Sequence, residues 1–303
     1  MIQVDAPWRL RGSLPRLGEA RAARDERIAQ GEAVTLFAIA ILALVQGITE
    51  FLPISSHGHL IVARSLLGLD EPGLIINIAV HVGTLGAVMV YFRRDVWLML
   101  IGVGEIIMGE DGAGRRLLIA VLVATVPVLV AGYFVMTYLG EDLNTIAVIG
   151  WTTLGFAVLL YFSDRIGMTM RRIEHMGLAQ ALIIGLFQVL ALVPGTSRSG
   201  ITMTAARLLG LERTEAARFS LLLSIPAILG AGALAGIALY QAGDARLQEA
   251  ALLAAAFAFL AALAAISLMM AWLRRATFTP FVIYRVVLGA GLLIWVYFFQ
   301  AGP

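Results

Sequence analysis

Two polar segments interrupt an otherwise apolar chain, and the first has residue types typical of an active site. Gln46 and Glu50 are four residues apart, so they lie on one face if this stretch is helical. Pro53 ends that helix, and Ser55 and Ser56 then stand where a second helix would be capped. Because a carboxylate can activate a neighbouring hydroxyl as a nucleophile, this segment predicts a catalytic centre.

The same segment adds two imidazoles, and a third lies further along the chain. His57 and His59 flank Gly58 at the start of the predicted second helix, whereas His81 falls in the first complete apolar span. Histidine can serve as acid, base or nucleophile, so His59 is an alternative nucleophile to the serine, and direct attack by water also stays open. We expect His57 and His81 to be auxiliary residues, together with Gln46.

The second polar segment, residues 194–200, carries a positive charge and several hydroxyl groups. Pro194 and Gly195 break the apolar stretch, and Arg198 can hold phosphate oxygens through two parallel hydrogen bonds. The free N–H groups at each new helix start also favour an anion. The expected substrate-binding residues of both segments are Ser55, Gly58, Gly195, Thr196, Ser197 and Ser199.

If the two segments meet, their side chains and helix N-termini suit a phosphate ester or a diphosphate. Phosphoryl transfer needs positioning and charge stabilisation more than covalent chemistry from the protein. The predicted catalytic residues are Glu50, Ser56, His59 and Arg198.

The composition requires that these segments lie in a membrane protein. Of the 303 residues, 60% are hydrophobic and 14% charged, with a mean hydropathy of +0.90. Apolar usage in soluble domains is nearer half, so the bilayer must solvate much of this chain. The absence of cysteine excludes disulfides and thiolate metal sites, and a net charge of +2 argues against nucleic acid as a partner.

The apolar pattern predicts an all-α polytopic fold with about six transmembrane helices and two re-entrant helical hairpins. The hairpins are expected at 34–69 and 178–211, because the apolar stretches on either side of each polar segment are too short to cross a bilayer. Irregular backbone at membrane depth is tolerated where it lines a cavity. The expected spans are 74–92, 115–139, 145–163, 217–240, 247–272 and 279–299.

The two broken stretches resemble each other, which indicates an internal duplication. Gln46 and Gln188 begin the two similar stretches, and each stretch continues through a proline and a hydroxyl pair to an arginine. Interrupted helices at corresponding positions in two halves are the usual sign of a binding site in the membrane. The expected organisation is a polar tail at 1–33, a first repeat at 34–140, a connecting span and cytoplasmic loop at 141–177, and a second repeat at 178–300.

The arginines predict the orientation. Placing Arg93 and Arg94 in the cytoplasm puts most other arginine-rich loops there too, as the positive-inside rule requires. The first hairpin then enters from outside and the second from inside, which is the geometry of an inverted-topology repeat. Arg285, about five residues into the last span, is interpreted as a side chain that snorkels to the interface.

Both polar segments resemble signatures of the undecaprenyl-diphosphate phosphatase family, also called bacitracin-resistance proteins. The first signature is matched by residues 46–59, QGITEFLPISSHGH, and the second by residues 192–200, LVPGTSRSG. Residues 278–285, FTPFVIYR, are similar to the segment that opens the family's last span. The similarity covers about residues 36–299.

This resemblance implies removal of the terminal phosphate from undecaprenyl diphosphate, a polyprenyl diphosphate lipid, in the bacterial inner membrane. It also implies an active site that faces the periplasm, recycling of the carrier lipid for cell-wall synthesis, and bacitracin resistance when the protein is abundant. A homodimer is the candidate assembly. By position, Glu50, the serine pair 55–56, His59 and Arg198 match the family's functional residues, and Thr196, Ser197 and Ser199 match its phosphate-loop hydroxyls.

The sequence departs from the family pattern at two positions. Gln46 stands where many members carry a glutamate, which removes one charge from a metal site, and His57 replaces a residue that is often threonine. Magnesium commonly keeps several waters and uses few carboxylates, so Mg²⁺ or another divalent cation is still expected at Glu50, with Gln46 beside it.

Two other functions stay open at this point. Inverted repeats with broken helices are also transporter architecture, so a transporter or flippase of a phosphorylated lipid is the alternative. Glu50 argues against a pure anion carrier, which gains nothing from a carboxylate facing its substrate. An inactive structural relative is a third interpretation, and it depends on Gln46 alone.

Overall fold

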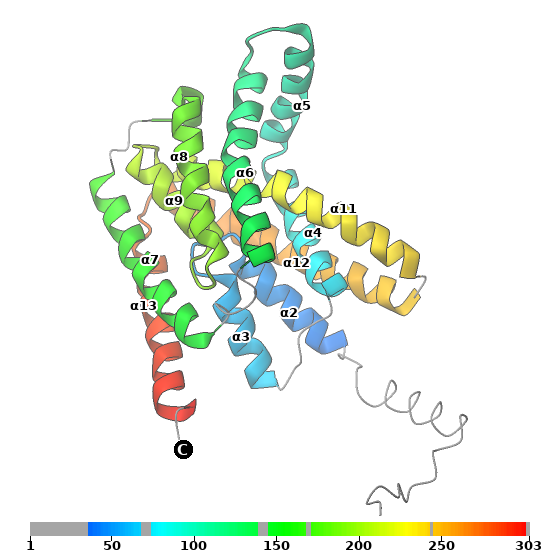
Figure 1. Ribbon diagram of the computed structural model, residues 1–303, viewed down its shortest axis with the longest axis vertical. Helices are drawn as coiled ribbons and strands as arrows, with labels where there is room; N and C mark the ends of the chain where they lie inside the picture. The colour runs from blue at the N-terminus through cyan, green and yellow to red at the C-terminus, as the bar shows by residue number, and fades with distance from the viewer. Residues whose placement is uncertain (1–35, 68–73, 139–144, 168–170, 243–244, 301–303) are drawn as a thin grey trace, which may run out of the picture. The chain divides into compact units, whose positions relative to one another are not determined.

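The computed structural model describes residues 36–67, 74–138, 145–167, 171–242 and 245–300, and these residues are helical apart from short connections (Figure 1). The expected polar tail at 1–33 and the expected repeat boundaries near 69 and 140 lie outside the described residues. The described part contains no named strand, so the predicted all-α fold is confirmed.

The elements of the first half begin with the two short helices around the first polar segment. In chain order they are α2 (Leu36–Thr49), α3 (Ser56–Leu67), α4 (Leu74–Tyr91), α5 (Arg93–Met108), α6 (Ala113–Tyr138) and α7 (Ile146–Ile166). The second half comprises η1 (Ile173–His175), α8 (Leu178–Val189), η2 (Leu190–Leu192), α9 (Arg198–Leu208), α10 (Arg213–Leu222), α11 (Ser224–Ala242), α12 (Ala245–Leu273), α13 (Thr279–Ile294) and η3 (Trp295–Gln300).

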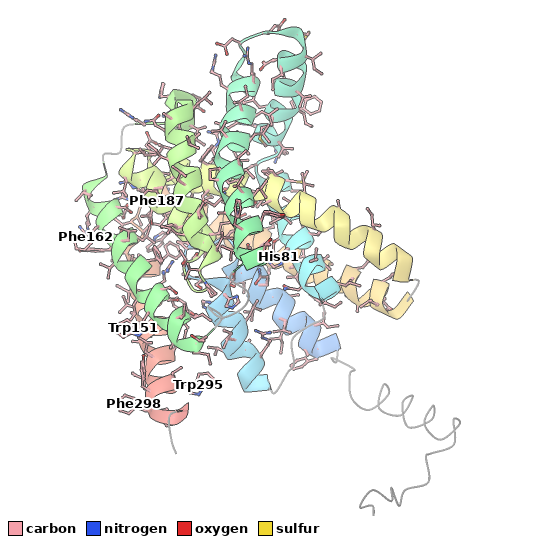
Figure 2. All side chains as sticks on the ribbon, in the orientation of Figure 1. His81, Trp151, Phe162, Phe187, Trp295 and Phe298 are labelled. Atoms are coloured by element: carbon pink, nitrogen blue, oxygen red, sulfur yellow. The ribbon has the colours of Figure 1, made fainter. Side chains whose placement is uncertain are left out.

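Several of these helices are long and apolar enough to cross a membrane. Within the described residues four qualify by length and composition, or five if α4 and α5, which meet at an angle of 87°, count as one broken span. Large apolar side chains such as Trp151, Phe162 and Phe298 point outward and are exposed, as expected for a surface that faces lipid (Figure 2). The chain is therefore a multi-pass membrane protein.

The expected count of six spans differs from this result in one clear place. The sequence predicted a single span over 217–240, whereas the structure breaks it between α10 and α11, at Leu223. Pro226 lies just after the break. A proline has no N–H for the helix ladder, and its ring clashes with the carbonyl of the residue four positions earlier, so helices end or kink there.

A second difference concerns residues 93–108, which were expected to lie in a cytoplasmic connection. They form α5, which lies beside α6 as a helical hairpin (Figure 1). Gly109, with a φ of 73°, ends α5 in the left-handed conformation typical of a helix C-terminus.

Both predicted helix breaks are confirmed, and each broken pair packs against the opposite half of the chain. α2 packs against α12, and α8 packs against α6. The contacts are close because of glycines. A Cβ on Gly47 would lie 2.7 Å from the carbonyl oxygen of Ala258, and one on Gly185 would lie 2.5 Å from that of Ala124. Small residues of this kind let membrane helices approach closely, so they fix the position of both breaks.

The arginine-rich connections are tied together by buried ion pairs. Asp164, which is 4% exposed, accepts hydrogen bonds from Arg207, from Arg213 and from the backbone N–H of Phe278. In a second cluster Arg218 pairs with Asp95. Charges that are buried in this way are stable only when paired, so these clusters hold the loops around α10 in place.

Candidate active site

The two helix breaks have the same backbone geometry. Ser55 and Ser197 have φ values of 70° and 68°, and each stands directly before a helix, α3 and α9 respectively. A residue other than glycine costs of the order of 1 kcal/mol or more in this left-handed region and persists only where its surroundings hold it. The Ser197 hydroxyl accepts a hydrogen bond from the N–H of Gly200 at 3.2 Å, so it caps α9.

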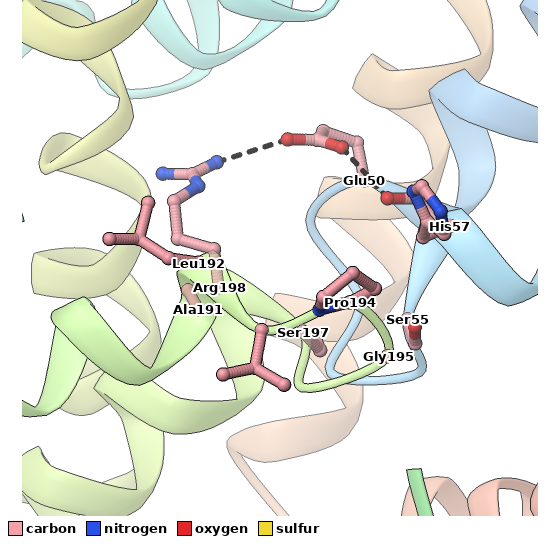
Figure 3. A pocket seen from close by; sticks show the side chains of 11 residues that line it. Glu50, Ser55, His57, Ala191, Leu192, Pro194, Gly195, Ser197 and Arg198 are labelled. Atoms are coloured by element: carbon pink, nitrogen blue, oxygen red, sulfur yellow. Dashed lines mark hydrogen bonds and ion pairs between the residues drawn. The ribbon is translucent and has the colours of Figure 1, made fainter. Parts of the chain in front are cut away.

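A cavity of about 280 Å³ lies between the two breaks (Figure 3). Both predicted polar segments contribute to its wall, although they are far apart in the chain. The residues that line it are Glu50, Ser55, Ser56, His57, Ala191, Leu192, Val193, Pro194, Gly195, Ser197 and Arg198. The sequence therefore identified the two segments that meet.

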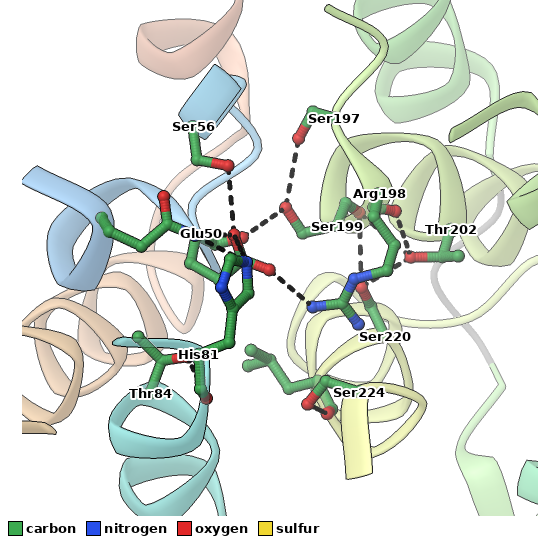
Figure 4. Close-up of polar contacts among 12 residues, drawn as sticks. Glu50, Ser56, His81, Thr84, Ser197, Arg198, Ser199, Thr202, Ser220 and Ser224 are labelled. Atoms are coloured by element: carbon green, nitrogen blue, oxygen red, sulfur yellow. Dashed lines mark hydrogen bonds and ion pairs between the residues drawn. The ribbon is translucent and has the colours of Figure 1, made fainter. Parts of the chain in front are cut away.

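Glu50 is the centre of the polar contacts in this cavity (Figure 4). Its Oε2 accepts hydrogen bonds from Gln46 Nε2 at 2.6 Å and from Ser56 Oγ at 3.1 Å. Its Oε1 accepts one from Arg198 Nη2 at 3.3 Å, across 148 residues of sequence. The carboxylate is thus placed to take a proton from Ser56 while Arg198 balances its charge.

The two terminal nitrogens of the Arg198 guanidinium differ in their contacts. Its Nη2 binds Glu50, and its guanidinium lies 5.9 Å from the centre of the Phe51 ring. Its Nη1 is buried and has no hydrogen-bond partner within the described residues. Because a buried donor without a partner is costly, Nη1 is the kind of group that an anionic ligand would satisfy.

The second break is held by α7 and allows only glycine at its tip. Gly195 has a φ of +87°, and a Cβ there would lie 2.2 Å from Thr152 Oγ1. Thr152 donates to the carbonyl of Pro194 at 2.6 Å, and Thr153 donates to that of Gly195 at 3.2 Å. Thr196 is fully buried, with an Oγ1 that has no partner within the described residues.

Ser199 does not line the cavity but joins the two breaks. Its hydroxyl donates to the carbonyl of Leu52 at 3.0 Å and lies 3.2 Å from the hydroxyl of Ser197. Ser55, by contrast, lines the cavity with a buried hydroxyl that has no partner within the described residues.

Arg285 differs from its interpretation as a snorkelling side chain. It is fully buried and points inward between the breaks. It donates hydrogen bonds to the carbonyls of Thr153, Gly195 and Thr196 at 3.0–3.3 Å, and to that of Pro53 at 3.5 Å. The sequence placed Arg285 near a membrane interface, and nothing in the local pattern indicated these partners, which come from distant segments.

His59 and Gly58 lie outside the residues that line the cavity. The Nδ1 of His59 lies 2.7 Å from the carbonyl oxygen of Ser55, and its Nε2 lies 2.6 Å from the hydroxyl of Tyr284. Since a carbonyl only accepts, Nδ1 donates, and Nε2 accepts from the tyrosine. Both nitrogens are therefore engaged. Sequence reasoning did not single out Tyr284.

His57 lines the cavity, and His81 approaches it from α4. The Nε2 of His81 lies 3.1 Å from Gln46 Nε2 and 3.9 Å from Glu50 Oε2. The two auxiliary residues outside the breaks, Gln46 and His81, thus meet at Glu50 (Figure 4).

These features define a multi-pass membrane protein with a polar cavity between two helix breaks. Residues 39–291 match the family described as bacitracin resistance protein BacA, and the chain belongs to this family. The resemblance stated from the motifs is thereby confirmed.

Its relatives include proteins named undecaprenyl-diphosphatase. The one from Jannaschia sp. (strain CCS1) is 49% identical over 266 residues, which cover 87% of this chain and 100% of the relative. The one from Dinoroseobacter shibae is 50% identical over 266 residues, with the same coverage. Undecaprenyl-diphosphatase 1 from Rhodospirillum rubrum is 50% identical over 269 residues, 86% of this chain and 95% of the relative.

Proposed function

We propose that this protein hydrolyses undecaprenyl diphosphate to undecaprenyl phosphate and phosphate, which returns the carrier lipid to cell-wall synthesis. The observation that carries the proposal is the Ser56–Glu50–Arg198 chain of hydrogen bonds, which joins both helix breaks across one polar cavity. Family membership and relatives named undecaprenyl-diphosphatase support the choice of substrate.

Arg198 and the two helix starts bind the diphosphate in this proposal. The unpartnered Nη1 of Arg198 meets a phosphate oxygen, and the free N–H groups at the starts of α3 and α9 add further donors. The buried hydroxyls of Ser55 and Thr196 are unpartnered within the described residues and belong to the same binding set.

Ser56 is the nucleophile that the geometry favours. Its Oγ forms a bond to the terminal phosphorus as the bond from that phosphorus to the bridging oxygen breaks, and undecaprenyl phosphate leaves. Glu50 Oε2, 3.1 Å away, takes the serine proton. Glu50 gives that proton to the departing undecaprenyl phosphate and is a carboxylate again. Water then attacks the phosphoserine while Glu50 takes one of the water protons, and the bond from phosphorus to Ser56 Oγ breaks. Glu50 passes this proton to Ser56 Oγ, which restores the hydroxyl and releases phosphate.

His59 has a positioning role in this scheme rather than a nucleophilic one. Both of its ring nitrogens are occupied, by the Ser55 carbonyl and by the Tyr284 hydroxyl. Its N–H group supports the strained backbone of Ser55, directly before the nucleophile.

A divalent cation such as Mg²⁺ fits the residues at Glu50. Gln46 places a carbonyl oxygen, Oε1, in the protein interior without a partner within the described residues, and Glu50 supplies a carboxylate. One or two protein oxygens together with substrate phosphates are a common way to hold Mg²⁺. When bound, the cation would neutralise charge on the phosphates.

The proposed location is the bacterial inner membrane, with the cavity open to the periplasm. Two ion-pair clusters support this orientation. Arg207 and Arg213 pair with Asp164 near the end of α7, and Arg218 pairs with Asp95 near the start of α5, so arginine-rich segments that were assigned to the cytoplasm contact one another.

Phosphate release from undecaprenyl diphosphate by purified protein tests the proposal. Glu50→Ala and Arg198→Ala should each lower the rate by at least about 100-fold, because each removes a charged group from the reaction. Arg116→Ala is the matched control, since its side chain is 58% exposed and lies outside the cavity. Equal release by all four proteins would overturn the assignment, and lipid movement without phosphate release would favour a transporter.

A further inference from the structure

His81 brings an imidazole to the site from outside both polar segments. It lies on α4, and Figure 4 shows its ring beside the Glu50 carboxylate. Its Nε2 is 3.9 Å from Glu50 Oε2, and Gln46 Nε2 lies between them, 2.6 Å from Glu50 Oε2 and 3.1 Å from His81 Nε2. The proposed reaction assigns no role to His81.

The hydrogen bonds decide which nitrogen of His81 carries the proton. Its Nδ1 lies 2.8 Å from the carbonyl oxygen of Asn77, and a carbonyl can only accept, so Nδ1 holds the hydrogen. Nε2 is then the unprotonated nitrogen and accepts from the Gln46 amide. The lone pair of Nε2 therefore lies on the side of Glu50, where it could bind a metal ion.

The three side chains have the spacing of metal ligands. Oxygen and nitrogen ligands about 2.1 Å from a cation are roughly 3 Å apart when adjacent and roughly 4 Å apart when opposite, so the observed 2.6, 3.1 and 3.9 Å fall close to this range. Gln46 is 2% exposed, and its Oε1 has no partner within the described residues. Half a turn of its amide would place that oxygen where Nε2 now lies.

We propose that Glu50, His81 and Gln46 hold a divalent cation through two oxygens and one imidazole nitrogen. The proposal deepens the function proposed above and depends on it only for the role of the cation. The amide of Gln46 holds the two other ligands apart in the absence of metal and turns its carbonyl toward the cation when metal binds.

A nitrogen ligand changes which cations the site prefers. Imidazole suits Co²⁺ and Zn²⁺ better than Mg²⁺, which prefers oxygen ligands. Co²⁺ and Zn²⁺ should therefore bind more tightly than Mg²⁺. Gln46→Glu, which adds a charged oxygen, should reduce the difference in affinity between these ions and Mg²⁺.

Pulsed electron paramagnetic resonance of the purified protein with Mn²⁺ alone tests the ligand directly. The wild type should show the ¹⁴N modulation of one imidazole, and His81→Ala should lose it and bind Mn²⁺ at least about tenfold more weakly. His57→Ala, which removes the imidazole that lines the cavity, and His175→Ala, outside it, should keep the signal. The wild-type spectrum alone can contradict the proposal, so the test does not depend on whether a variant folds.

No ¹⁴N modulation in the wild type, or its loss in His57→Ala instead, would overturn the proposal. Phosphate release is measured separately on the same preparations. Modulation without phosphatase activity would reject the proposed function and keep the metal site, whereas activity without modulation would reject the site and keep the function.

Discussion

At the first helix break Ser55 has a φ of 70° before α3, and at the second Ser197 has a φ of 68° before α9. Each break also follows a helix that contains a buried glutamine, Gln46 or Gln188. The side chains next to these features differ, because the first break presents Glu50 to the cavity and the second presents Arg198. The same backbone feature thus presents a carboxylate at one break and a guanidinium at the other.

The largest effect should come from the serines, and it should differ between the two breaks. Ser56→Ala removes the proposed nucleophile and should lower the turnover of undecaprenyl diphosphate by about 1,000-fold or more. Ser197→Ala removes only a helix cap and one binding hydroxyl, so we expect a loss below about tenfold. Steady-state phosphate release measures both.

A trapped phosphoenzyme sharpens the same comparison. An acid-stable phosphoryl group that is absent from Ser56→Ala would support serine attack. An acid-labile group would point to histidine, and turnover without any trapped group in the wild type would favour direct attack by water.

A smaller effect is expected where the two breaks share one support. Arg285 donates to carbonyls of both breaks, so Arg285→Met should leave several buried carbonyls without donors and cost about 2–4 kcal/mol of stability. Thermal unfolding in detergent measures this loss. Arg285→Lys keeps the charge but has fewer donors, so its stability should lie between that of the wild type and that of Arg285→Met. An unchanged unfolding temperature for Arg285→Met would contradict the idea that Arg285 supports both breaks.

The smallest effects concern the strained backbone itself. Ser55→Gly and Ser197→Gly relieve the positive φ but make the unfolded chain more flexible, so each should change stability by less than about 1 kcal/mol. Ser55→Ala keeps the strain and is the matched control. Unequal shifts of the unfolding temperature for the two glycine variants would show that the strain energy differs between the two breaks, although their φ angles agree.

Much of the site could be predicted because its chemistry is local in sequence. Glu50 and Ser56 belong to one polar segment and Arg198 to another, and polar residues stand out in an apolar chain. The helix breaks were predictable for the same reason.

What could not be predicted depends on packing between distant segments. Arg285 lies on α13 and Tyr284 next to it, and their partners at 53, 59, 153, 195 and 196 become neighbours only in the folded protein. The break before α11 was missed because the sequence around Pro226 is as apolar as an intact span.

The crossed packing of the two broken helices sets an order for synthesis. α8 rests on α6, which the ribosome has already made, whereas α2 must wait for α12, near the end of the chain. The helix that leads to Arg198 can therefore pack before the helix that leads to Glu50, although it comes later in the sequence. A chain that stops before α12 lacks the helix against which α2 packs, and it also lacks Arg285 on α13, which holds both breaks.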